Sequence, residues 1–133
     1  IHTFLAEVDA YLTENASTPG LSAYLSGLSK ALGLLKQASA WIAKNAPANP
    51  NNAGAASADY LRLFALVTLS YMWARIVKSV LARQAAGSST PALDSKLPLA
   101  AFFNERVLPL AEAHLACLTT GADCVMALRD EAF

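Results

Sequence analysis

Apolar residues recur every three or four positions in four stretches of the chain, which is the spacing of an amphipathic helix. The stretches cover about residues 3–15, 21–45 and 55–86, and a last one that starts between Asp94 and Leu97 and runs to about Thr120. No stretch alternates apolar and polar residues as a strand does. The pattern predicts an all-α fold, a four-helix up-down-up-down bundle.

Glycine and proline separate these stretches. Thr18-Pro19-Gly20 ends the first helix and Gly87 to Pro91 ends the third. Residues 46–54, rich in Asn, Pro and Ala, predict a mobile loop, with Ser57 or Asp59 as the cap of the third helix. Pro109 lies within the fourth stretch and predicts a kink, because it cannot donate to the carbonyl of Glu105. Gly121 is a suitable C-cap.

Length and charge narrow the class of protein. The 133 residues favour one domain, residues 1–133, and the net charge of zero argues against nucleic-acid binding. The longest charge-free apolar run, Leu63 to Ala74, has twelve residues, too few for the roughly 20 of a transmembrane helix. Cys117 and Cys124 are read as free thiols. Because the chain opens on Ile1 without a signal peptide, we expect a fragment of a larger protein.

Few side chains suggest a catalytic or ligand-binding role. His114 lies on the apolar face of the fourth stretch, where a structural histidine is favoured over a general base or ligand. Glu105 and Glu112, seven apart, fit a solvated helix face better than an acid–base pair. Arg62 either pairs with Asp59 on its own helix or bridges to another element. We therefore assign no catalytic, cofactor-binding or metal-binding residue to this chain.

Four large apolar residues lie away from the main stripes. Leu34 and Trp41 share a second stripe on one helix, and Phe64 and Tyr71 fall among the basic residues of the next. Either the bundle interior extends far enough to cover them, or they form a second buried face against another domain or subunit. Because two helices show the feature, we favour an interface at Leu34, Trp41, Phe64 and Tyr71.

Three blocks of sequence carry a family resemblance. They are Ala58 to Val67 with Tyr71 to Arg75, Phe102 to Pro109, and Gly121 to Leu128 followed by Phe133. Together they resemble the C-terminal domain appended to large bacterial acyl-CoA dehydrogenases, described as acetyl-CoA dehydrogenase C-terminal-like. That group includes enzymes similar to 3-methylmercaptopropionyl-CoA dehydrogenase.

The resemblance implies a dehydrogenase body in the same parent chain before Ile1. Such a body binds FAD and oxidises acyl-CoA to 2-enoyl-CoA, so the cofactor and the catalytic base belong to it. This domain would then be a non-catalytic accessory or assembly domain of a cytoplasmic homo-oligomer. An independent protein-docking or lipid-surface module is the alternative, and a complete small enzyme is the third reading.

Overall fold

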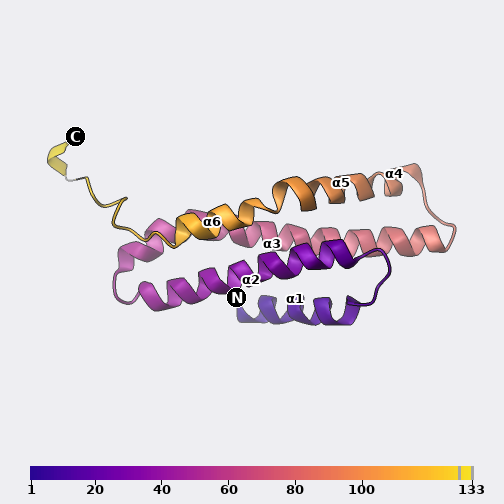
Figure 1. The fold of residues 1–133 in the computed structure, drawn as a ribbon, viewed down its shortest axis with the longest axis horizontal. Coiled ribbons are helices and arrows are strands. Elements are labelled where there is room, and N and C mark those ends of the chain that lie inside the picture. The colour runs from indigo at the N-terminus through magenta and orange to yellow at the C-terminus, as the bar shows by residue number, and fades with distance from the viewer. Residues whose placement is uncertain (129, 133) are drawn as a thin grey trace.

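The chain was analysed as a computed structural model that describes residues 1–128 and 130–132. All regular structure in these residues is helical (Figure 1), so the predicted all-α class is confirmed. The α-helices are α1 (His2–Asn15), α2 (Ser22–Asn45), α3 (Pro50–Ala85), α4 (Pro91–Asp94), α5 (Lys96–Phe102) and α6 (Leu110–Leu118). A π-helical segment η1 (Phe103–Val107) lies between α5 and α6, and a 3-10 turn η2 (Asp130–Ala132) lies near the end of the chain.

The helix pair α2 and α3 forms the centre of the molecule and makes the most extensive contact between elements. Helices α5 and α6 lie along one flank of this pair and the shorter α1 lies along the other (Figure 1). The side chains between them are fully buried leucines and valines, among them Leu28, Leu32, Leu35, Leu63 and Val67. Burial of these side chains supplies the main driving force for the fold.

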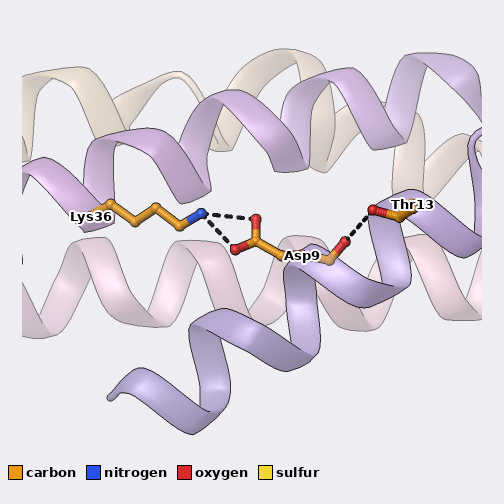
Figure 2. A network of polar contacts seen from close by, with 3 residues as sticks. All are labelled: Asp9, Thr13 and Lys36. Atoms are coloured by element: carbon orange, nitrogen blue, oxygen red, sulfur yellow. Dashed lines mark hydrogen bonds and ion pairs between the residues drawn. The ribbon is translucent and has the colours of Figure 1, made fainter.

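An ion pair joins α1 to α2 on the surface. Lys36 Nζ lies 2.8 and 2.6 Å from the two carboxylate oxygens of Asp9, as Figure 2 shows. The Thr13 hydroxyl donates to the backbone carbonyl of Asp9 over 3.0 Å. Since both charged side chains are about half exposed, the pair contributes about 0–1 kcal/mol and mainly fixes the position of α1 on α2.

Helix α3 begins five residues earlier than the sequence predicted. Only residues 46–49 separate α2 from α3, because Asn49 caps the helix by accepting from the Asn51 amide at 3.1 Å and Pro50 occupies the first position. The predicted loop over 46–54 is therefore wrong beyond Asn49, as are the predicted caps. Ser57 donates instead to the Gly54 carbonyl within the helix.

The fourth predicted helix is divided into several pieces. Thr90 caps α4, so Pro91 starts a helix where the sequence predicted only a stop. The regular α-helical hydrogen bonding is interrupted near Glu105, as the missing N–H of Pro109 predicted: the amide of Leu108 donates to the carbonyl of Phe103 over 2.9 Å, which closes the wider turn of a π-helix. The wide turn directly precedes the proline, whose missing N–H leaves Glu105 without its α-helical donor.

Two glycines matter for the packing of the fourth segment. Gly121 has a φ of +77°, so it adopts the left-handed conformation expected just past a helix end. At Gly27 in α2, an added Cβ would overlap the side-chain oxygen of Asn104 and lie 3.1 Å from Leu108 Cδ2. The glycine therefore permits the close approach of α2 to η1 and its flank.

Candidate interaction surfaces

Helix α1 covers two of the four proposed interface residues. Phe4 packs against Phe64 with ring centroids 5.0 Å apart, and Tyr11 meets the edge of Tyr71 at 5.1 Å. Tyr71 is only 5% exposed and donates its hydroxyl to Glu7 at 2.9 Å. Tyr71 is therefore a core residue within one chain, and the expectation that it is exposed is wrong. Phe64 is half-buried.

Burial under α1 also shifts the pKa of the Tyr71 and Tyr11 hydroxyls. Desolvation is the main cause that raises the pKa of the Tyr71 hydroxyl above its ordinary value, and the hydrogen bond to Glu7 adds to it. Desolvation likewise raises the pKa of Tyr11, whose buried hydroxyl oxygen has no hydrogen-bond partner. The Arg75 guanidinium lies 5.4 Å from the Tyr71 ring centroid and opposes both shifts weakly. Both groups stay neutral at physiological pH.

The other two proposed residues line a groove between α2 and α6, here called the α2–α6 groove. Leu34 borders two adjoining hollows of about 200 and 690 Å³, and Trp41 borders the larger one. Both side chains are half-buried. An ion pair between Lys30 and Glu112 lies on the border of both hollows, with both side chains more than half exposed. Glu112 thus lies on a solvated face, as predicted.

A third hollow opens beside the start of α1, between α2 and α3. It measures about 600 Å³ and is lined mainly by apolar side chains: Ile1, Ile42, Ala43, Ala53, Tyr60, Leu61 and Phe64. Leu61 is 69% exposed. We call this hollow the open groove. It is the only one of the three in which Phe64, from the proposed interface set, contributes to the wall.

A further set of apolar side chains is more exposed than any of the four proposed residues. These side chains are 37–60% exposed, and together we call them the outer face: Leu69, Met72 and Ile76 of α3, and Leu99, Phe102 and Leu110 of α5 and α6. Where α3 meets the fourth segment, the rings of Trp73 and Phe103 lie tilted by 35° with their centroids 6.5 Å apart. Leu69, Met72 and Ile76 recur three or four positions apart and so share one face of α3, and Leu99 and Phe102, three apart, share one face of α5.

The outer face was not identified in the sequence. Helical spacing alone places Leu69 and Ile76 on the main apolar stripe of the third stretch, and Leu99, Leu110 and Cys117 on that of the fourth, yet all five are exposed. The available signal was the width of the stripe on the third segment, which covers nearly half the helix circumference. A helix with two packed neighbours on one side cannot bury so wide a stripe within one small bundle.

The polar side chains of His114, Asp59 and Arg62 form one small contact between α6 and α3. His114 Nδ1 lies 2.9 Å from Asp59 Oδ1, which joins α6 to α3. The Arg62 guanidinium is 3.9 Å from the same carboxylate, so the predicted pair within the helix is present but long. His114 is half-buried, as predicted for a structural histidine. Within the described residues, no three His, Cys, Asp or Glu side chains gather as a metal site would require.

Helix α3 is long and apolar enough to span a membrane when judged by length and composition alone. However, 44% of its most apolar 18-residue window is buried against the rest of the bundle. A central helix of a soluble protein shows the same property, so this one weakly apolar helix does not show a membrane span.

Comparison with known proteins agrees with the resemblance noted in the sequence. A family model described as acetyl-CoA dehydrogenase C-terminal like matches residues 4–129, nearly the whole chain. No match was found among curated proteins. The family description implies a parent chain that also carries a dehydrogenase body. The chain therefore belongs to the acetyl-CoA dehydrogenase C-terminal-like family.

Proposed function

We propose that this chain is a non-catalytic accessory domain of an FAD-dependent acyl-CoA dehydrogenase, which oxidises acyl-CoA to 2-enoyl-CoA. The observation that carries the proposal is the family match over residues 4–129. The dehydrogenase body supplies FAD, the catalytic base and the acyl-CoA site. This domain contributes a surface that docks on the body and supports assembly of a homo-oligomer. We also propose that its main helices follow one another in an up-down-up-down bundle.

The outer face suits this docking role better than the residues first proposed. Its six side chains come from α3 and from α5 and α6, which both contact α3, and each is at least 37% exposed. Full burial of a side chain of this kind contributes about 1.5–3 kcal/mol relative to leaving it in water. Apolar area of this kind on one face is typical of a protein–protein contact.

The polar surroundings support the same reading. Arg62 of α3, and Arg106 of η1 between α5 and α6, are exposed on or beside the helices that carry the outer face. Apolar interface centres are usually surrounded by polar groups of this kind. The two cysteines are exposed free thiols, which fits a reducing compartment and supports a cytoplasmic enzyme.

Docking can be tested by separating the two parts. The parent enzyme is truncated before Ile1, and the isolated domain is added back while binding is followed by calorimetry. We expect the domain to bind the body, and the double substitution Leu69→Glu, Ile76→Glu to weaken binding by at least about tenfold. Val125→Glu is the matched control, because Val125 is also exposed but lies outside the outer face.

The result that contradicts the docking role is equally clear. If the wild-type domain and the double variant bind the body equally well, the outer face is not the contact. If the domain instead binds phospholipid vesicles and does not bind the dehydrogenase body, it is better explained as an independent lipid-surface module.

A further inference from the structure

A hollow of about 310 Å³ lies between α1 and α3, on a side of the molecule that no other candidate surface uses. It is lined by Tyr11 of α1 and by four residues of α3: Arg75, Lys78, Ser79 and Ala82. These four residues are three or four positions apart, so they share one face of the helix. We call this hollow the basic hollow. It shares no lining residue with the three hollows described above.

The two cationic side chains of the basic hollow, Arg75 and Lys78, form no ion pair with any described residue. The ion pairs in that part of the chain involve other cations: Lys30, Lys36, Arg62 and His114. The Glu7 carboxylate accepts from the Tyr71 hydroxyl at 2.9 Å and is not among these pairs. Because Arg75 and Lys78 are neighbours on one helix face, their like charges repel each other. An anion bound between them would relieve this repulsion.

Aromatic rings fix the position of both cations. The Arg75 guanidinium lies 5.4 Å from the Tyr71 ring centroid, and Lys78 Nζ lies 5.9 Å from that of Tyr11. Contacts of this kind restrict long side chains that would otherwise sample many rotamers. The two rings also meet edge to face with their centroids 5.1 Å apart. The two cations therefore belong to one packed unit, which lowers the entropy lost when both bind a single ligand.

Two hydroxyl groups add donors to the basic hollow. The Tyr11 hydroxyl oxygen is buried and has no hydrogen-bond partner, which is rare in folded proteins. The flexible stem of Lys78, which lies over the Tyr11 ring, allows an anion to reach this hydroxyl as the ammonium group moves with it. Ser79 is exposed on the opposite helix of the same hollow. The lining thus offers two cations and two hydroxyls, and no carboxylate.

We propose that the basic hollow binds a phosphate group, either as inorganic phosphate or as a phosphate monoester of a small ligand. A phosphate monoester carries a charge of about −1.5 to −2 at pH 7 and has three strong acceptor oxygens. The planar fork of Arg75 binds two of these oxygens, and Lys78 neutralises the second charge. The Tyr11 and Ser79 hydroxyls donate to the oxygens that remain. A carboxylate has one charge and two oxygens, so Arg75 alone would satisfy it.

Titration of this chain with sodium phosphate at pH 7, followed by two-dimensional amide NMR, tests the site. Sodium chloride keeps the ionic strength constant, so that general screening does not change. We expect saturable shifts of the amides around Tyr11 and from Arg75 to Ala82. Acetate should bind at least about fivefold more weakly than phosphate, because it lacks the second charge.

A comparison of ligands identifies the source of the phosphate group. Adenosine monophosphate and inorganic phosphate should shift the same amides, whereas adenosine should shift none of them. Tighter binding of adenosine monophosphate would assign the site to a phosphate ester, and equal or weaker binding would assign it to free phosphate.

Substitutions assign the binding to individual side chains. Arg75→Gln and Lys78→Gln should each weaken phosphate binding by at least about fivefold, because each removes a charge-assisted contact. Tyr11→Phe should weaken it by at least about threefold, because it removes one neutral donor. Lys44→Gln is the matched control, because it removes the same charge from an exposed lysine outside the hollow, and it should bind as the wild type does. Circular dichroism checks that every variant is folded.

Several results would overturn the proposal. The absence of saturable shifts at about 50 mM phosphate would show that the hollow does not bind this group. Equal losses in Lys44→Gln and Arg75→Gln would show that phosphate only screens the surface charge. Acetate binding as tight as phosphate binding would assign the hollow to carboxylates instead, and wild-type affinity in Tyr11→Phe would refute the assigned geometry.

Discussion

The glycines of α2 provide a matched test of how closely this helix approaches the π-helical segment. Alanine in place of glycine within a helix stabilises by about 0.8–1.0 kcal/mol when nothing else changes. An added Cβ at Gly33 meets nothing within 4 Å, so Gly33→Ala should show this full gain. At Gly27 the same Cβ overlaps the Asn104 side chain and lies 3.1 Å from Leu108 Cδ2.

The cost at Gly27 is the displacement of Asn104 and Leu108. Moving packed side chains to admit one methyl group typically costs about 1–3 kcal/mol. This cost equals or exceeds the helix-propensity gain, so Gly27→Ala should leave the free energy of unfolding unchanged or lower it by up to about 2 kcal/mol. The two variants should therefore differ by at least about 1 kcal/mol, or about 4 °C in melting temperature.

Urea unfolding followed by circular dichroism measures both values under the same conditions. Asn104→Ala supplies the control, because it removes the group that the new methyl meets. In that background Gly27→Ala should become more favourable than in the wild type, and Gly33→Ala should be unaffected. If Gly27→Ala stabilises the wild-type chain as much as Gly33→Ala does, the close contact between α2 and Asn104 is wrong.

Three further predictions concern the core, two buried tyrosines and one carboxylate. Leu63→Ala, at a fully buried position, should lower the free energy of unfolding by about 2–5 kcal/mol, and a loss below 1 kcal/mol in urea unfolding would argue against the core described. Tyr71 and Tyr11 should ionise above the ordinary pKa of 10.0, chiefly because burial desolvates their hydroxyls. Their contribution to the free energy of unfolding is therefore complete below pH 10 and is lost as the pH rises above it. Phenolate absorbance during an alkaline titration checks this. Hydrogen bonds from Ser89, the larger cause, and from Gln84 hold the pKa of the Asp94 carboxyl below its ordinary 3.8. The contribution of Asp94 to stability is therefore present above pH 3.8 and is lost as the pH falls below that value. Asp94→Asn should destabilise at pH 7 and converge with the wild type in acid, and an undiminished difference in acid would contradict the assignment.

The periodicity of apolar residues was sufficient to predict the helices but not all of their ends. The start of α3 was missed because Asn49 and Pro50 were read as loop residues, whereas together they form a cap and a first helical turn. The interruption near Glu105 was predictable because proline removes one donor whatever its surroundings. The form of the interruption, a π-helical turn whose Asn104 lies against Gly27 of α2, was not predicted from the sequence.

The burial of the proposed interface residues could not be predicted from the sequence alone. A helical wheel places Tyr71 away from the main stripe, but only the fold shows that α1 covers it. The wheel likewise places Leu69 within a broad stripe, but it cannot show that neighbouring helices leave that edge open. Which face is covered depends on contacts between elements distant in sequence, so the candidate surfaces required the three-dimensional arrangement.

The central claim is that this domain belongs to an FAD-dependent acyl-CoA dehydrogenase and is itself non-catalytic. The most direct measurement is the visible absorption spectrum of the whole parent protein and of the isolated domain, each before and after anaerobic addition of acyl-CoA. The account predicts flavin bands in the parent that bleach with acyl-CoA, and no flavin absorbance in the isolated domain supplied with FAD. A parent without flavin, or an isolated domain that binds FAD stoichiometrically, would contradict it.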